Sequence, residues 1–316
     1  MSRQIAGVLT ALILLTLFLG GCRPSAEEPN WAGVENFLYQ LQRADPDRIG
    51  ETAFDLAVVT LATAGSSPEV IPALKDSPGG PKLILCYMSI GQSENYRWYW
   101  NPDWELNPPS WLDLPDEVWA GDHWVRYWDP DWQEIIYGKS GSYLDQILAL
   151  GFDGVYLDRV DAYWYYQDQG RETAAREMVD FILDFTTYAR QRHPGFGIFP
   201  QNAEELGIRF PDYLQAMTGV GVEDLYYGYP RDHEPSPAGW TAEREAILDQ
   251  WVAAGKLVLT IDYTARPEQI ADTYSRAHAR GYIPYVTDRS LGRLRINPGF
   301  EPERDPEDWI FTTPTP

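Results

Sequence analysis

Five polar side chains close short apolar runs from the middle of the chain onward. They are Asp158, Asn202, Glu223, Asp262 and Asp288. Two of them, Asp158 and Glu223, directly follow valine- and leucine-containing runs, so strand ends would hold them rigidly. Glycosidic hydrolysis needs two such groups, one protonated to assist the departing oxygen and one ionised to attack carbon or activate water. Any one of these carboxylates, taken alone, is equally an N-cap or a loop-orienting group.

The apolar runs number eight, and amphipathic stretches separate them. They cover residues 36–42, 55–61, 82–90, 151–158, 195–202, 214–223, 256–262 and 282–288. Eight such strands with helices between them predict a single-domain α/β fold, the (β/α)8 TIM barrel, over residues 31–300. In such a barrel the carboxyl ends of all strands share one rim, so Asp158 on the fourth strand and Glu223 on the sixth can face each other. The same rim would also suit a metal-dependent lyase or a binding protein.

Three helices are expected between the later strands. Apolar residues recur at helical spacing in segments 178–189 and 247–252. A third helix is expected to begin at Pro267 and to end at Gly281.

A long insertion separates the third strand from the fourth. Residues 91–140 hold eight of the 13 tryptophans: Trp98, Trp100, Trp104, Trp111, Trp119, Trp124, Trp128 and Trp132. Flat aromatic rings pack against the C–H faces of sugars, so the segment can form a cleft wall. The alternative is that the rings form the insertion's own small core. Trp98 and Trp100, beside Glu94 and Arg97, are the ones expected nearest the site.

The first residues have the features of an export signal. Arg3 precedes an apolar run over residues 5–19, which is shorter than a membrane span, and the run ends in LGGC (19–22). This ending resembles a bacterial lipobox. We therefore expect a signal peptide over 1–21, lipidation of Cys22, a tether over 22–30, and an extracytoplasmic protein anchored by lipid to the cell envelope; ordinary secretion and an uncleaved anchor are the alternatives. A proline-rich tail covers 301–316.

The composition restricts the partners. There are 25 Lys plus Arg against 47 Asp plus Glu, a formal net charge of −22, which repels nucleic acid and is compatible with a cationic polymer. After Cys22, only Cys86 remains, so an intramolecular disulfide is not expected. The four histidines lack ligand spacing and no phosphate-binding glycine loop is present, so neither a metal nor another cofactor is expected.

Four motifs resemble glycoside hydrolase family 114, the endo-α-1,4-polygalactosaminidase-like barrels. They are CYMSIGQSENYRWYW (86–100), GFDGVYLDRVDAY (151–163), PQNAEEL (200–206) and GVGVEDLYYG (219–228), and the resemblance spans about residues 31–290. It implies that Asp158 is the nucleophile and Glu223 the general acid and base. It also implies substrate-binding roles for Tyr87, Ser89, Glu94 and Arg97 after the third strand, for Asp161 and Asn202, and for Asp262 on the far side. Trp98, in the insertion, is a further residue that we expect to bind substrate.

The resulting hypothesis is endo-acting, retaining hydrolysis of an amino-sugar polysaccharide such as α-1,4-linked galactosamine. Retention predicts carboxyl groups about 5–5.5 Å apart, against roughly 6.5–9.5 Å for inversion. Glu223, as the acid, should have a raised pKa. Two alternatives remain: a non-catalytic carbohydrate-binding lipoprotein of the envelope, and a structural partner with a large exposed apolar patch away from the barrel mouth. The sequence does not indicate an oligomeric state.

Overall fold

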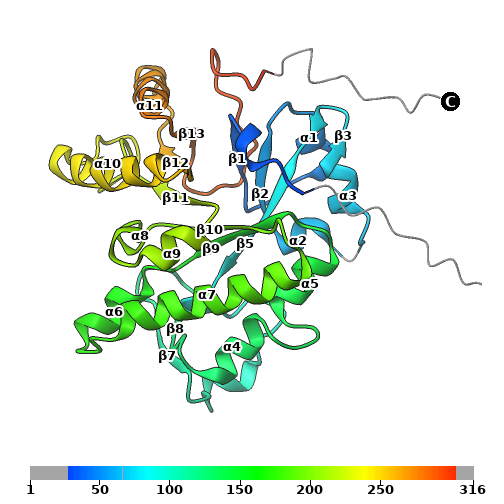
Figure 1. Cartoon of the computed structure of the whole chain (residues 1–316), viewed down its shortest axis with the longest axis vertical. Coiled ribbons are helices and arrows are strands. Elements are labelled where there is room, and N and C mark those ends of the chain that lie inside the picture. The colour runs from blue at the N-terminus through cyan, green and yellow to red at the C-terminus, as the bar shows by residue number, and fades with distance from the viewer. Residues whose placement is uncertain (1–27, 66, 304–316) are drawn as a thin grey trace, which may run out of the picture.

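Eight parallel strands form the centre of the molecule in the computed structural model, which describes residues 28–65 and 67–303 (Figure 1). Seven lie within the expected runs and β12 extends one residue beyond its run, to Tyr263, so the predicted (β/α)8 barrel is confirmed. The strands are β1 (Phe37–Tyr39), β2 (Leu56–Thr60), β5 (Leu83–Ser89), β9 (Gly154–Asp158), β10 (Gly197–Pro200), β11 (Gly219–Glu223), β12 (Leu257–Tyr263) and β13 (Ile283–Thr287).

The strands pair in the order in which they follow one another along the chain. One sheet runs β1-β2-β5-β9-β10 and a second runs β11-β12-β13. Gln201 forms a parallel bridge with Gly221, which links β10 to β11. On the other side, the amides of Leu41 and Gln42, which follow β1, donate to the carbonyl of Leu291, at 2.9 and 3.1 Å. The carboxyl ends of the eight strands therefore meet around one opening.

Helices cover the outside of the strands. They are α1 (Pro46–Gly50), α2 (Leu61–Ala64), α3 (Val70–Lys75), α5 (Tyr143–Ala149), α6 (Ala162–Asp168), α7 (Ala174–Arg192), α8 (Glu205–Arg209), α9 (Pro211–Ala216), α10 (Ala238–Ala253) and α11 (Pro267–Ala279). A 3-10 turn, η1 (Trp31–Gly33), precedes β1, and a hairpin of β3 (Asp76–Ser77) and β4 (Gly80–Pro81) precedes β5. The three helices expected from spacing and from Pro267 are confirmed as α7, α10 and α11. Up to residue 303, no helix follows β13.

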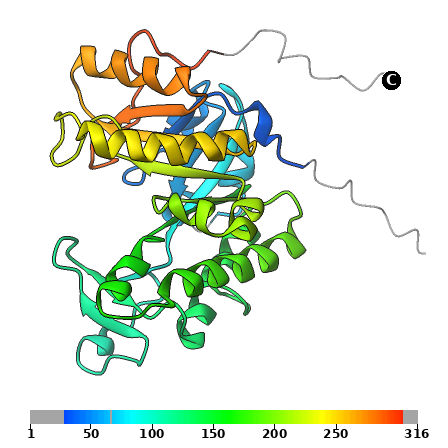
Figure 2. The same ribbon diagram turned by 60° about the vertical axis from the view of Figure 1, so that its left-hand side comes forward.

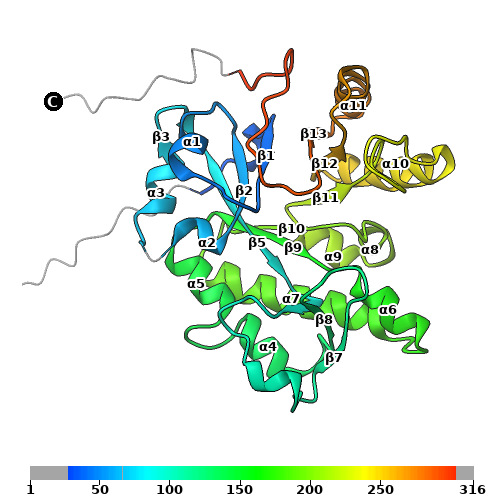
Figure 3. The ribbon, with the colours of Figure 1, turned by 180° about the vertical axis from the view of Figure 1, so that it is seen from behind.

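The insertion after β5 forms a separate layer at the end of the molecule opposite α11, as Figures 2 and 3 show. It contains β6 (Gln92–Glu94), η2 (Pro102–Glu105), β7 (Leu112–Pro115), β8 (Asp122–Val125) and α4 (Pro130–Ile136), with an antiparallel sheet in the order β6-β8-β7. Trp100, Trp104, Trp111 and Trp132 contact one another in series, at centroid distances of 5.3, 5.0 and 5.0 Å. Half of the insertion's eight tryptophans thus form a core of its own.

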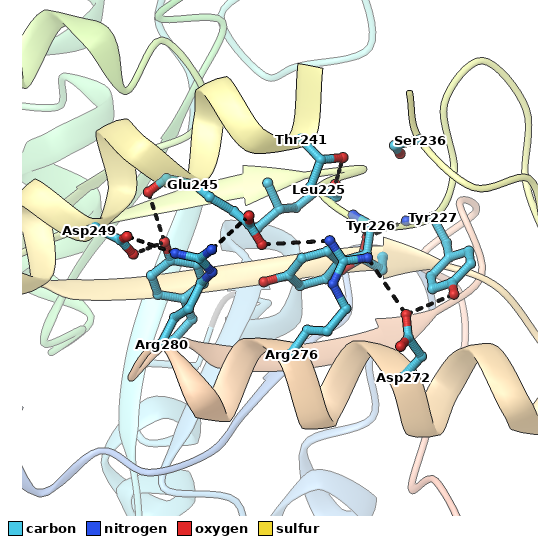
Figure 4. Close-up of polar contacts among 12 residues, drawn as sticks. Leu225, Tyr226, Tyr227, Ser236, Thr241, Glu245, Asp249, Asp272, Arg276 and Arg280 are labelled. Atoms are coloured by element: carbon cyan, nitrogen blue, oxygen red, sulfur yellow. Dashed lines mark hydrogen bonds and ion pairs between the residues drawn. The ribbon is translucent and has the colours of Figure 1, made fainter. Parts of the chain in front are cut away.

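A polar network joins α10 to α11 and to the loop that follows β11 (Figure 4). Glu245 accepts a hydrogen bond from Arg280 at 2.9 Å and forms an ion pair with Arg276 at 3.6 Å. Thr241, on the same helix, donates to the carbonyl of Leu225 at 2.8 Å. The loop after β11 is therefore bonded to α10, and α10 is bonded to α11.

The expected signal peptide, the lipidated Cys22 and most of the tether and tail lie outside the described residues and stay predictions. None of the described helices combines the length and the apolar character needed to cross a membrane. Cys86 is a buried free thiol within β5, where packing against the sheet accounts for it.

Candidate active site

A cavity of about 480 Å³ opens at the carboxyl ends of the barrel strands. This volume lies in the range of small-molecule sites, about 300–1,000 Å³. The lining side chains come from all eight strands or the segments that follow them, and from the insertion. They are Tyr39, Leu41, Gln42, Thr60, Ala62, Tyr87, Glu94, Tyr96, Arg97, Trp119, Asp122, Asp158, Arg159, Asp161, Gln201, Asn202, Glu223, Tyr263, Arg289, Ser290 and Leu291.

Asp158 and Glu223 share one hydrogen-bond donor. Nε2 of Gln201 lies 3.2 Å from Oδ1 of Asp158 and 2.6 Å from Oε2 of Glu223. The two carboxylate oxygens are therefore no farther apart than the sum of these two distances. That sum is below the roughly 6.5 Å at which inverting geometry begins. One sugar carbon can lie within reach of both groups.

The carboxylate of Asp158 is held by three donors. Besides Gln201, the hydroxyl of Tyr87 donates to Oδ2 at 2.5 Å, and the amide of Arg159 donates to Oδ1 at 2.7 Å. Arg159 has a φ of 61°, in the left-handed region that non-glycine residues seldom adopt. This backbone conformation brings the amide of Arg159 back to the preceding side chain. These donors fix the orientation of the carboxylate.

The residue after Glu223 repeats this local geometry. Asp224 also has a φ of 61°, so both strand-end carboxylates are followed by a left-handed turn. Such conformations cost of order 1–3 kcal/mol each and concentrate at functional sites. Asp224 is held in place by Arg289, whose Nη2 lies 2.7 Å from its Oδ1.

Glu223 is a carboxyl group whose pKa lies near neutrality. Burial raises the pKa of Glu223 to about 7, and the negative charge of Asp158 contributes next. The hydroxyl of Tyr263 donates to Oε1 and acts in the opposite direction. Asp158 is thus fixed as an acceptor, and Glu223 beside it can bind a proton near neutral pH. Acid-assisted hydrolysis needs this combination.

Gln201 is held by the first strand. Its Oε1 accepts a hydrogen bond from the hydroxyl of Tyr39 at 2.9 Å, and the ring of Tyr39 packs on that of Tyr156, with centroids 5.1 Å apart. Because the oxygen of the amide is occupied, its nitrogen must point toward the carboxylate pair. Tyr39 therefore orients the shared donor without lying between the two acids.

A family model named glycoside-hydrolase family GH114 matches residues 22–301. The chain belongs to this family. An uncharacterised protein of Thermotoga maritima is 34% identical and covers 98% of this chain and 99% of its own length. An uncharacterised protein of Deinococcus radiodurans is 36% identical over 87% of each chain.

Two solved structures share the fold. The glycoside hydrolase domain of PelA from Pseudomonas aeruginosa has a TM-score of 0.65 at 18% identity, covering 83% of this chain and 98% of its own. Ega3 from Aspergillus fumigatus, in complex with galactosamine, has a TM-score of 0.63 at 18% identity, covering 87% and 98%. Family membership and these glycosidase folds identify the chain as a glycoside hydrolase.

In this GH114 member, five of the eight residues expected to bind substrate line the cavity. They are Tyr87, Glu94, Arg97, Asp161 and Asn202. Burial raises the pKa of Asp161 to about 6. Asn202 accepts from the amide of Glu223 at 3.2 Å, so it also positions the acid.

The other three do not line it. Ser89 is buried and donates to the carbonyl of Gln92 at 3.0 Å, which closes the turn into the insertion. Asp262 is completely buried, and its Oδ1 accepts from the amides of Tyr226 and Tyr227 at 2.6 and 2.8 Å. Since strand side chains alternate between faces, the neighbour Tyr263 reaches the cavity in place of Asp262.

Trp98 contacts Tyr99 of the insertion and Tyr143 of α5, and it is 52% exposed. Of the eight tryptophans in the insertion, Trp119 is the one that lines the cavity.

Several residues that line the cavity were not predicted from the sequence. They are Tyr39, Tyr96, Trp119, Asp122, Arg159, Gln201, Tyr263 and Arg289. Gln201 was detectable, because it stands beside Asn202 at the end of a predicted strand. Trp119 and Asp122 were not, because the pairing inside the insertion decides their position. Among the described residues, no three His, Cys, Asp or Glu side chains are grouped to hold a metal ion.

Proposed function

We propose that the chain hydrolyses α-linked galactosamine-containing polysaccharide, cutting within the chain and with retention of anomeric configuration. The shared donor Gln201 carries the proposal, because the two oxygens that it bonds lie no farther apart than its hydrogen bonds of 3.2 and 2.6 Å together, which is below the roughly 6.5 Å at which inverting spacing begins.

In the first step, Glu223 donates its proton to the glycosidic oxygen while a carboxylate oxygen of Asp158 bonds to the anomeric carbon. The bond from that carbon to the leaving oxygen breaks, and a glycosyl ester of Asp158 forms. In the second step, ionised Glu223 takes a proton from water as the water oxygen attacks the same carbon. The ester bond breaks, the sugar leaves with its original configuration, and both carboxyl groups return to their starting states.

The charge of the cavity supports a cationic substrate. Its three arginines are each bonded to an acidic side chain: Arg97 to Glu94, Arg159 to Asp116, and Arg289 to Asp224 and Asp232. Asp161 shares Arg159 with Asp116, while Asp122, Asp158 and Glu223 form no ion pair with these arginines. A polymer carrying ammonium groups would supply a counter-charge, and the galactosamine named for Ega3 is a sugar of this kind.

The direct test is the release of reducing ends from partly deacetylated α-1,4-polygalactosamine, with neutral glucans as the comparison. Activity on the cationic polymer alone supports the proposal, and a fast fall in polymer length relative to reducing ends supports internal cutting. Asp158→Asn should reduce kcat by about 1,000-fold or more while polymer binding remains. A wild-type chain that binds the polymer and releases no reducing ends would instead be a carbohydrate-binding protein.

We also propose that the mature protein is attached to the bacterial envelope through a lipid on Cys22, since the LGGC ending stands directly after the apolar run. Labelling with a radioactive fatty acid tests this. Label on the wild type that is lost in Cys22→Ser supports the anchor; secretion of unlabelled wild-type protein contradicts it.

A further inference from the structure

We infer that the insertion supplies a separate sugar subsite, in which Asp122 binds the ammonium group of an amino sugar between the rings of Trp119 and Tyr96. This inference rests on the proposed function, since it assigns a residue that selects amino over N-acetylated sugars at a position away from the catalytic pair. Glu94, Tyr96, Arg97, Trp119 and Asp122 all line the cavity from the insertion.

Asp122 has a carboxylate with nothing bonded to it. Within the residues that the structure describes, its side chain makes neither a hydrogen bond nor an ion pair. Arg159 is the cation whose field reaches it, but Nη2 of Arg159 bonds Asp116 at 3.2 Å. Burial, followed by the charge of Glu94, raises the pKa of Asp122 to about 7. A ligand cation would provide the counter-charge that the protein lacks.

The position of Asp122 is unfavourable for folding. In the antiparallel pair of β6 and β8, Glu94 and Asp122 are directly opposite each other. Like charges in such a pair are destabilising. Arg97 compensates Glu94 through two hydrogen bonds, at 2.6 and 2.8 Å, and the hydroxyl of Tyr96 adds a third at 2.6 Å. The charge of Asp122 has no such compensation, which indicates that this residue serves ligand binding and not stability.

The two rings beside Asp122 are exposed although they lie in a rigid turn. Tyr96 is 63% exposed and Trp119 is 50% exposed, so neither serves the packed core of the insertion. The turn before Asp122 passes through Gly121 at a φ of +98°, and the carbonyl of Gly121 accepts from the amide of Asn95 at 2.9 Å. The guanidinium of Arg97 covers one face of the Tyr96 ring, 5.3 Å from its centroid, which leaves the other face of Tyr96 and the ring of Trp119 to contact the C–H face of a hexosamine whose ammonium group binds Asp122.

The subsite is continuous with the catalytic pair. The guanidinium of Arg97 lies over the ring of Tyr87, 5.9 Å from its centroid, and Tyr87 bonds Asp158. The insertion residues and the catalytic pair line one cavity, so a polymer with one residue at Asp158 and Glu223 can extend toward the insertion. Binding there would contribute to the affinity for polymer and to the choice of sugar without touching the reacting bond.

The test is calorimetric binding of two probes, an α-1,4-galactosamine oligomer and its fully N-acetylated form, to proteins carrying Glu223→Gln so that no cleavage occurs. Asp122→Asn should weaken binding of the amino oligomer about tenfold and leave the N-acetylated oligomer unchanged. Trp119→Ala should weaken both. Glu117→Gln is the matched control, because it removes one exposed charge in the same turn without lining the cavity.

The kinetic counterpart uses proteins with Glu223 intact. Asp122→Asn should raise KM for the amino polymer about tenfold with little change in kcat, and its melting temperature should rise because the repulsion with Glu94 is gone. Equal affinity of Asp122→Asn and the control for the amino oligomer, in a wild type that cleaves the polymer, overturns the subsite and leaves the proposed function standing. Absence of binding and cleavage by the wild type overturns both.

Discussion

Nε2 of Gln201 donates to Oδ1 of Asp158 and to Oε2 of Glu223, so one amide nitrogen sets the spacing of two acids that come from non-adjacent strands. The amide is itself oriented by Tyr39. Gln201 is therefore a positioning residue, and its loss should change the orientation of both carboxyl groups.

Replacing Gln201 with Ala should lower kcat/KM about 10–100-fold, which corresponds to about 1.4–2.7 kcal/mol. The basic limb of the pH profile should also move upward, because a donor to ionised Glu223 is lost. Gln215→Ala, at an exposed position on α9, is the control. An unchanged pH profile in Gln201→Ala would assign the residue a purely structural role.

The activity should fall as the pH rises through about 7. Glu223 must carry a proton in the first step, and its pKa lies near that value because of burial and of Asp158. Tyr263→Phe removes a hydrogen bond that favours the ionised form, so it should shift this limb to higher pH. Profiles of kcat/KM between pH 4 and 9 measure both effects. A downward shift in Tyr263→Phe would contradict the assignment of the acid.

The catalytic acid should reduce the stability of the fold above neutral pH. A carboxyl group whose pKa is raised by folding has no such effect below its unfolded value, where it is protonated in both states, and its full effect above the folded value of about 7. Glu223→Gln should therefore increase the free energy of unfolding at pH 8 by about 1–3 kcal/mol and change it little at pH 4. Thermal melts at both pH values test this difference. Equal gains at both would rule out ionisation as the cause.

Arg244 should be essential to the stability of the β10–β11 rim. It is buried, pairs with buried Glu204, and donates to the carbonyl of Glu223 at 2.8 Å and to Asn202 at 3.2 Å. Arg244→Met leaves Glu204 without a partner, which should cost about 3–5 kcal/mol in urea unfolding. Adding Glu204→Gln should recover part of that loss, since an uncharged amide tolerates burial better. An additive double variant would contradict the coupling.

Strand positions, the presence of three helices and the start of α11 were predictable, because they depend on local patterns. The run ending at Asp158 and the run ending at Glu223 are apolar and short, and parallel strands buried on both faces read in this way. Pro267 marked the start of α11 for an equally local reason, its fixed φ and missing amide hydrogen.

The side-chain direction at a strand end was less predictable. Asp262 and Tyr263 are neighbours, and one residue of difference in register decides which of them faces the cavity. Asp262 is buried and accepts hydrogen bonds from two backbone amides. A carboxylate at a strand end can therefore hold a loop in place instead of binding a ligand.

The sequence by itself determined the barrel, the rim on which the acids stand, and Asp158 and Glu223 as the acids to examine, because each follows from periodicity or from a motif read along the chain. Tertiary structure alone decided that Gln201 and Tyr39 connect those acids and that Trp119 and Asp122, rather than Trp98, reach the cavity. These contacts join segments far apart in the chain, and their geometry comes from strand closure and from pairing inside the insertion, which no local pattern encodes.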